Sequence, residues 1–159
     1  MSISGFIFFA AGFDTTQRLL QMAAYELAMN RSIQDDLIAE VDEVLSNMDG
    51  KPVSYEALHK MKFLDQVISE TLRMHPPVPF SSRECNKDYT MNLGNGKTVS
   101  IKNGENVFIP VRPIHRDEKL FENPNKFDPN RFDDSRKDLI KPGSFIPFGK
   151  IIICFKFYF

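Results

Sequence analysis

The pattern of apolar and polar residues favours one long helix at the start of the chain. From Ile3 to about Asn30 the side chains are first apolar on almost every side and then amphipathic with helical spacing. A helix that is apolar all round requires burial on every side. We therefore expect residues 1–13 to need further protein packed around them.

Three shorter helices follow, over about 33–45, 54–59 and 63–75, each with apolar residues at helical spacing or a capping residue before it. Their expected boundaries are Ser32 as N-cap of the first, Asp49-Gly50 and Pro52 as the break after it, Ser54 as N-cap of the second, and Pro76-Pro77 as the stop after the third.

Beyond Pro76 the pattern changes to short strands, and past Pro113 repeated prolines indicate an irregular connection. The expected strands are Tyr89–Leu93, Thr98–Ile101 and Val107–Ile109, with Asn95-Gly96 and Asn103-Gly104 as tight hairpin turns. Helices followed by a small antiparallel β-sheet predict an α+β fold that is mostly α.

Composition narrows the class of protein without naming a function. The 159 residues suffice for one domain, and 42% apolar and 26% charged residues are ordinary for a soluble globular chain. The net charge of −1 gives no electrostatic case for binding nucleic acid. Two distant cysteines, Cys85 and Cys154, do not make a disulfide framework and favour a reducing compartment. The apolar stretch 5–13 is far shorter than the ~20 residues of a membrane-spanning helix.

Residues 12–16 of the first helix allow two interpretations. Gly12, Asp14 and Thr15 are unusual in an apolar run, and they could mark a helix start with Asp14 as N-cap. Alternatively, a continuous helix crosses a flat surface there. Gly12 then permits close approach, and a hydroxyl beside a carboxylate can relay protons. Thr15 could also donate back to a preceding carbonyl.

Glu70 and Arg73, one helical turn apart, also allow two interpretations. Pairs with this spacing are most often exposed and contribute a few tenths of a kcal/mol. A buried pair would need further partners to offset desolvation, and Arg131 in the irregular segment is a candidate third member.

The sequence gives little support to a metal site, a serine nucleophile or a phosphate-binding loop. The histidines at 59, 75 and 115 lack the spacing of metal ligands, so no metal site is assigned. The chain has no GxSxG nucleophile elbow and no phosphate-binding glycine loop.

In this order and at these separations, the motifs resemble the C-terminal portion of the cytochrome P450 family, the haem-thiolate monooxygenases, in particular insect microsomal members. AGFDTT at 11–16 resembles the family's distal helix motif, ETLR at 70–73 its ExxR element, and FDPNRF at 127–132 its FxPxRF pattern. HPPVPFSSREC at 75–85 and HRD at 115–117 match as well. The likeness runs from about residue 3 to Gly149.

The resemblance implies a partial cytochrome P450 fold and a haem site. Asp14 and Thr15 would be the catalytic acid–alcohol pair that supplies protons during oxygen activation. Ala11 and Gly12 would face the haem on the same helix, and Arg83 would contact a haem propionate.

Further roles implied by the resemblance are structural or concern the substrate. Glu70, Arg73 and Arg131 would form a buried structural cluster that braces the segment leading to the haem cysteine. The residues that fall where the family partly sets its substrate specificity are Val78, Phe80 and Ser81.

The likeness stops after Gly149. The family's haem signature FGxGxRxCxG, started at Phe148, places the thiolate at position 155, where this chain has Phe155. Cys154 is one residue early and lacks the expected neighbours, so the ligand role is not transferred to it.

We interpret 3–149 as the C-terminal portion of a cytochrome P450 domain and 150–159 as an aberrant tail. Gly149-Lys150 can be encoded with GTAA, the usual start of an intron, which favours a translated intron.

For the parent family the resemblance implies insertion of one oxygen atom from O2 into a lipophilic substrate, with electrons from an NADPH-dependent reductase, at the cytoplasmic face of the endoplasmic reticulum membrane. We expect this chain to lack the family's membrane anchor. We expect the fragment itself to be inactive and not to bind haem stably. The alternatives are a non-catalytic truncated or pseudogene-derived product, a small binding module, and an unrelated α+β interaction domain whose motifs coincide by chance.

Overall fold

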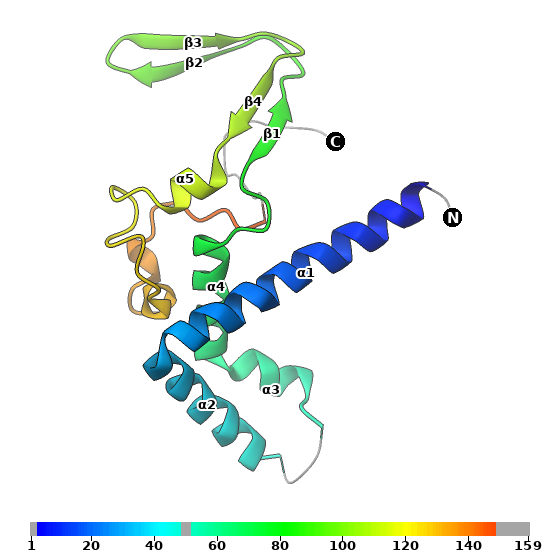
Figure 1. Cartoon of the computed structure of the whole chain (residues 1–159). Coiled ribbons are helices and arrows are strands. Elements are labelled where there is room, and N and C mark those ends of the chain that lie inside the picture. Colours follow the sequence, from blue (N-terminus) through cyan, green and yellow to red (C-terminus); the bar gives the residue numbers. More distant parts are fainter. Residues whose placement is uncertain (1–2, 49–51, 149–159) are drawn as a thin grey trace.

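The computed structural model describes residues 3–48 and 52–148, which form helices, two small antiparallel sheets and a long irregular segment (Figure 1). The helices are α1 (Ile3–Met29), α2 (Arg31–Ser46), α3 (Tyr55–Lys60), α4 (Lys62–Met74) and α5 (Val111–His115). The strands are β1 (Ser81–Glu84), β2 (Tyr89–Gly94), β3 (Lys97–Ile101) and β4 (Asn106–Ile109). The predicted α+β fold, mostly α, is confirmed. Within the described ranges, no helix combines the length and the apolar character needed to cross a membrane.

Helix α1 is uninterrupted, so the alternative of a helix start capped by Asp14 is wrong. The hydroxyls of Thr15 and Thr16 donate back to the carbonyl oxygens of Ala11 and Gly12, at 2.7 and 3.0 Å. These polar side chains are therefore satisfied within the helix and do not end it. The N-terminal half of α1 extends away from the other helices in Figure 1.

Helix α2 begins before the predicted cap, so the assignment of Ser32 as N-cap is wrong. Asn30 occupies the N-cap position without a side-chain capping bond, and the N–H of Gln34 donates to its carbonyl oxygen at 3.1 Å. The side chain of Asn30 instead donates back to the carbonyl oxygen of Glu26 at 2.8 Å. Because only Asn30 separates the two helices, the second starts without a separate capping side chain.

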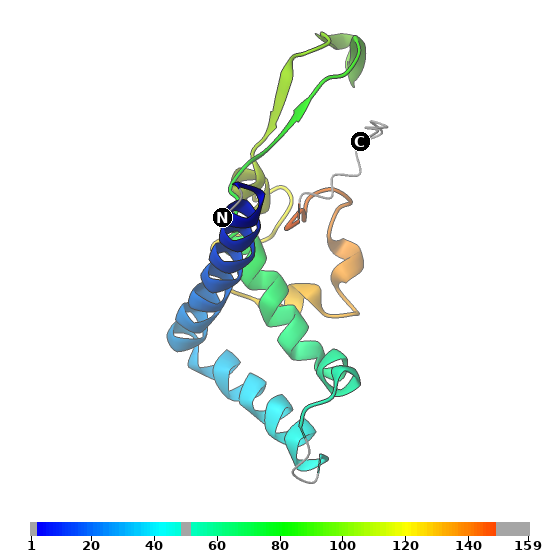
Figure 2. The ribbon, with the colours of Figure 1, turned by 90° about the vertical axis from the view of Figure 1, so that its right-hand side faces the viewer.

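The predicted helices around α4 are confirmed and enclose a small apolar core. Ser54 caps α3 and accepts the N–H of Ala57 at 3.1 Å. The buried residues Val67 and Met74 of α4 pack with Phe127 from the irregular segment. Partly buried side chains from α1, α2 and α4 cover this core: Leu27, Ile33, Leu37 and Phe63. Figure 2 shows α4 between the long helix and the irregular segment.

The strands form two separate antiparallel pairs that together make a long bent arm (Figure 2). Strand β2 pairs with β3 through Asn95 and Gly96, whose φ angles of 53° and 71° confirm the predicted tight turn. Strand β1, which pairs with β4, was not predicted because its sequence SSRE has no β-branched or aromatic residue.

The prediction of a second tight hairpin at Asn103-Gly104 is wrong, because β3 and β4 do not pair with each other. This dipeptide lies in a turn at the bend of the arm. The N–H of Glu105 donates to the carbonyl oxygen of Lys102 at 3.1 Å, and the N–H of Gly104 donates to that of Cys85 at 2.7 Å. The positive φ of Gly104, 83°, suits glycine at this bend.

The segment after α5 is irregular, as predicted, apart from the short 3-10 helices η1 (Pro129–Phe132) and η2 (Lys137–Leu139). The helix α5 itself, which contains Pro113, was not predicted. The tail 150–159, for which poor packing is expected, lies outside the described residues together with Gly149 and Cys154.

Candidate functional site

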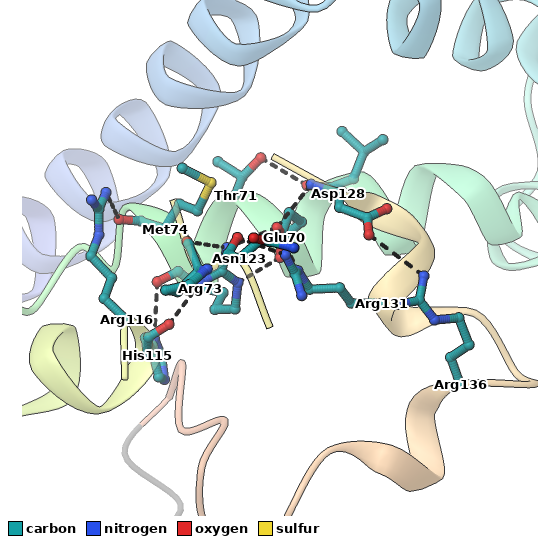
Figure 3. A network of polar contacts seen from close by, with 12 residues as sticks. Glu70, Thr71, Arg73, Met74, His115, Arg116, Asn123, Asp128, Arg131 and Arg136 are labelled. Atoms are coloured by element: carbon teal, nitrogen blue, oxygen red, sulfur yellow. Dashed lines mark hydrogen bonds and ion pairs between the residues drawn. The ribbon is translucent and has the colours of Figure 1, made fainter. Parts of the chain in front are cut away.

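Three charged side chains meet beside α4, from segments far apart in the sequence (Figure 3). Glu70 and Arg73 lie one turn apart on α4, and Arg131 belongs to η1. The side chains of Glu70 and Arg73 are 0% exposed and that of Arg131 is 8% exposed. The interpretation of Glu70 and Arg73 as a surface pair is therefore wrong, and the predicted approach of Arg131 is confirmed.

The carboxylate of Glu70 accepts hydrogen bonds at both oxygens. Arg73 donates from Nε to Oε2 at 2.7 Å and from Nη2 to Oε1 at 2.8 Å. Arg131 donates from Nε to Oε1 at 3.3 Å, and the backbone N–H of Asp128 donates to the same oxygen at 2.9 Å. Arg131 also donates from Nη2 to the carbonyl oxygen of Asn123 at 2.9 Å. Charge-assisted bonds therefore tie α4 to the segment that carries η1.

The other donors of Arg73 reach the same irregular segment and the end of α5. Nη1 donates to the carbonyl oxygen of His115 at 2.7 Å, and Nη2 donates to that of Pro124 at 2.9 Å. The guanidinium carbon lies 5.2 Å from the ring centre of Phe121. A buried ion pair compensates its desolvation only when its remaining donors find partners, and these contacts give every nitrogen of the guanidinium at least one hydrogen bond.

His115 continues this network toward the end of the described chain. Its side chain is fully buried. Nδ1 lies 3.1 Å from the carbonyl oxygen of Arg73, and Nε2 accepts the N–H of Ile146 at 3.0 Å. Burial lowers the pKa of His115 to about 4, so the ring is neutral near pH 7. The sequence offered only the HRD pattern here, and nothing in it indicated a buried imidazole between two distant segments.

A cavity of 360 Å³ lies where α1, β1 and the end of the described chain meet. The lining residues that the resemblance had assigned are Thr15, Val78, Phe80, Ser81 and Arg83. The lining residues that sequence reasoning missed are Pro77, Val111, Ile146, Pro147 and Phe148. Tertiary packing therefore brings segments near positions 15, 80 and 147 to one concave surface.

The AGFDTT residues lie on an exposed stretch of α1 and do not all share this cavity. Thr15 lines it, whereas Gly12 borders a second, more open hollow of 640 Å³ on the surface of α1. Ala11 and Asp14 are exposed and line neither hollow. A Cβ added at Gly12 would have no neighbouring atom within 4 Å, so the described residues leave open space over this turn.

Arg83 brings positive charge to the wall of the cavity. It lies on β1 opposite Val107 and is half-buried. Its Nη1 donates to Oγ of Ser81 at 2.9 Å and to the carbonyl oxygen of Ser82 at 2.8 Å. These contacts hold a guanidinium beside the apolar side chains of the wall, an arrangement that suits an apolar ligand with an anionic group.

Comparison with known proteins identifies the same family as the sequence motifs. The family described as Cytochrome P450 matches residues 2–150. Probable cytochrome P450 9f2 of Drosophila melanogaster is 45% identical over 91% of this chain and 28% of its own length. Cytochrome P450 9e2 of Blattella germanica is 45% identical over 90% of this chain and 26% of its own length. Probable cytochrome P450 6a14 of Drosophila melanogaster is 40% identical over 94% of this chain and 29% of its own length. The chain thus spans less than a third of the length of these relatives.

The chemistry of the cavity would suit the edge of a haem, while Cys85 and His115 both have partners elsewhere in the described part of the chain. The cavity combines apolar side chains with the guanidinium of Arg83, which suits a flat apolar ring with carboxylates. Cys85 is buried at the bend of the arm, where its Sγ lies 2.8 Å from the carbonyl oxygen of Lys87. Both ring nitrogens of His115 have partners within the protein. Across residues 3–48 and 52–148, no group of three or more histidine, cysteine or acidic side chains could hold a metal ion.

Proposed function

Because the chain belongs to the cytochrome P450 family, we propose that it is the C-terminal portion of a haem-thiolate monooxygenase of the insect microsomal type. The observation that carries this proposal is the buried cluster of Glu70, Arg73 and Arg131, joined through His115 to the wall of a cavity that Thr15 lines. The parent protein would insert one oxygen atom from O2 into a lipophilic substrate. It would take electrons from an NADPH-dependent reductase at the cytoplasmic face of the endoplasmic reticulum membrane.

The cavity residues would divide between cofactor and substrate. The guanidinium of Arg83 would neutralise a haem propionate, because a planar cation with several donors matches a carboxylate. Val78 and Phe80 are each 56% exposed, and together with Ser81 they would contact the lipophilic substrate. Apolar side chains with one nearby hydroxyl are typical of sites that bind such molecules.

Residues of the AGFDTT motif would handle protons and make room for the ring. The Thr15 hydroxyl donates its hydrogen to the carbonyl oxygen of Ala11, so its oxygen is left to accept a hydrogen bond from a water in the cavity and to hold that water in place. The exposed carboxylate of Asp14 would exchange protons between such waters and the solvent. Ala11 and Gly12, with small or no side chains, would allow the ring to lie close to the helix.

By itself the chain would be inactive. Residues 3–149 would belong to the monooxygenase domain, and residues 150–159 would be an aberrant tail. In haem-thiolate proteins the cysteine ligand donates electron density that favours cleavage of the O–O bond. Cys154 is out of register for this role, with Phe155 at the expected position. A non-catalytic product or a small binding module is therefore the alternative for the 159-residue chain. The further alternative of an unrelated interaction domain is excluded by the family match.

A pair of chimeras tests the proposal. In the first, residues 3–149 of this chain replace the matching segment of cytochrome P450 9e2 of Blattella germanica, and the rest of that protein is kept. We expect the reduced, carbon monoxide-treated protein to show the thiolate-haem Soret band and to oxidise a lipophilic substrate with reductase and NADPH. The second chimera carries residues 3–159 and ends there, and we expect no such band.

Two outcomes would contradict the proposal. Absence of haem from the first chimera would show that these residues do not build the site, and a thiolate band in the second would show that the tail can supply a ligand. In the first chimera, Thr15→Ala should lower product formation by roughly 100-fold at unchanged haem content, the lower range for loss of a group that takes part in positioned proton transfer.

The origin of the tail is decided by nucleic acid sequence. We expect the gene to contain an intron that begins after the Gly149 codon, and the spliced message to continue into a GxRxCxG loop. A mature message that encodes IIICFKFYF, from a gene without an intron at this point, would show that the tail belongs to the protein.

A further inference from the structure

His115 connects the two halves of the candidate site. Its ring lies between the end of α4, where Arg73 belongs to the buried charge cluster, and the irregular stretch that contains Ile146. These partners are 42 and 31 residues away in the sequence. Ile146 is 2% exposed and lines the cavity with Pro147 and Phe148. The imidazole is therefore the polar link between the cluster and one wall of the cavity.

The two partners require one tautomer of the ring. The Arg73 carbonyl oxygen can only accept, so Nδ1 of His115 must carry the proton and donate it. The N–H of Ile146 can only donate, so Nε2 must be unprotonated and accept. A neutral imidazole with its proton on Nδ1 meets both conditions, and neither the imidazolium nor the other neutral tautomer does.

The surroundings hold the ring in this orientation. Phe121 meets it edge-on at 6.5 Å between ring centres, and Phe145 lies against it at 5.5 Å. The charged group that faces it from α4 is the guanidinium of Arg73, which donates to the backbone carbonyl oxygen of His115 at 2.7 Å. This cation opposes a second proton on the ring, so the environment favours the neutral form that the two hydrogen bonds require.

We propose that His115 is a positioning residue. It accepts a hydrogen bond from the Ile146 N–H and thereby fixes where Ile146, Pro147 and Phe148, which form one wall of the cavity, lie relative to α4. The hydrogen bond fixes the backbone at the point where the chain turns from the irregular segment toward the cavity. Pro147 has no N–H, so the Ile146 amide is the last backbone donor before Phe148. Loss of this bond would let the wall shift while the charge cluster stays in place.

This role deepens the proposed function and rests on it only in taking the cavity as part of the cofactor site. The hydrogen bond can be tested without haem, so its failure is distinguishable from failure of the chimeras. A defect that affects only the binding of substrate or cofactor would leave the hydrogen-exchange rate of the Ile146 amide unchanged.

The test compares two substitutions that each imitate one ring nitrogen in the full 159-residue chain. The amide of His115→Asn reaches the position of Nδ1 and can still donate to Arg73, but it cannot reach Ile146. The side chain of His115→Gln reaches the position of Nε2 and can accept from Ile146. The matched control is His59→Asn, at an exposed position of α3. Selective 15N labelling of isoleucine allows the hydrogen-exchange rate of the Ile146 amide to be measured. Its resonance is identified as the one that disappears in an Ile146→Val variant.

We expect exchange of the Ile146 amide to accelerate by about tenfold or more in His115→Asn, the effect of losing one buried hydrogen bond, and to stay within about threefold of the parent chain in His115→Gln and His59→Asn. An unchanged rate in His115→Asn would overturn the proposal, as would equal acceleration in the Asn and Gln variants.

A second measurement covers the case in which His115→Asn does not fold. The 15N chemical shifts of labelled histidine in the parent chain report which ring nitrogen carries the proton. We expect a protonated Nδ1 and an unprotonated Nε2 for His115 at pH 7. A proton on Nε2 would exclude acceptance from Ile146 and overturn the proposal by itself.

Discussion

The carboxylate of Glu26 and the imidazole of His75 lie 2.6 Å apart, from Oε1 to Nε2, and join the last turn of α1 to the residue that ends α4. The side chain of Glu26 is 9% exposed and that of His75 is 23% exposed. Asn30 donates from Nδ2 to the other carboxylate oxygen of Glu26 at 3.4 Å. This contact sets where the helix that carries Thr15 crosses the helix that carries the charge cluster.

Substitution of either partner should loosen this crossing. We expect Glu26→Ala and His75→Ala each to lower the free energy of unfolding by about 1–3 kcal/mol, because each leaves a poorly exposed polar partner unpaired. In urea titrations the double variant should cost less than the sum of the two single variants, since both remove the same contact. Glu43→Ala, at an exposed position of α2, is the control and should change the free energy of unfolding by less than about 0.5 kcal/mol. Additive single effects would show that the two residues act independently.

The buried cluster should not tolerate an exchange of one cation for another. Arg73→Lys keeps the charge but cannot reproduce the two bonds to Glu70 together with those to the carbonyls of His115 and Pro124. We expect a loss of about 3–5 kcal/mol in the free energy of unfolding, as for a broken buried ion pair. Arg31→Lys is the matched control, because Arg31 forms an exposed pair with Asp35 at 3.1 Å. Equal effects of the two substitutions in urea unfolding would contradict the structural role of the cluster.

The stability of the chain should decrease in mildly acidic solution through His115. The pKa of its ring falls from 6.5 to about 4 on folding, chiefly because of burial, so the unfolded chain takes up the proton first as the pH falls. The stabilising contribution of the neutral ring is complete above pH 6.5 and is lost progressively down to about pH 4. This corresponds to roughly 3 kcal/mol. We expect the difference in unfolding free energy between the parent chain and His115→Gln, which does not titrate, to shrink over this range. Parallel pH profiles would argue against a buried neutral histidine.

Two glycines should respond to alanine in opposite directions. Gly12 lies inside α1 with open space around it, so Gly12→Ala should raise the free energy of unfolding by about 0.5–1 kcal/mol through higher helix propensity. Gly96 has a φ of 71° in the β2–β3 turn, so Gly96→Ala should lower the free energy of unfolding.

In the haem-binding chimera, Gly12→Ala should reduce haem content despite the gain in helix stability. Unchanged haem content would show that the ring does not approach this turn.

The tail should control the solubility of the isolated chain. Residues 150–159 combine a run of β-prone apolar residues with two lysines and no turn residue, a composition that favours aggregation when exposed. We expect the 159-residue chain to be markedly less soluble than a chain that ends at Gly149, as measured by the soluble fraction after centrifugation over a range of concentrations. Equal solubility would mean that the tail is covered in solution.

The sequence by itself determined the features that depend on neighbouring residues. Helical spacing predicted α1 and α4, Ser54 predicted the cap of α3, and Asn95-Gly96 predicted the turn between β2 and β3. Each is decided by backbone geometry and by hydrogen bonds over a few positions. The order and separation of the motifs likewise identified the family before any contact between them was known.

Tertiary structure alone decided which of these residues are buried and what they touch. Glu70 and Arg73 have the spacing of an ordinary surface pair, and they are buried because carbonyls 42 and 51 residues from Arg73 converge on its guanidinium. The failure of Asn103-Gly104 as a hairpin and the existence of β1 follow from pairing between strands that are not adjacent in sequence. Such contacts depend on where distant segments are brought in space, and local propensity carries no information about that. The bond from Ile146 to His115 is of the same kind, since neither residue alone has a pattern that identifies the other.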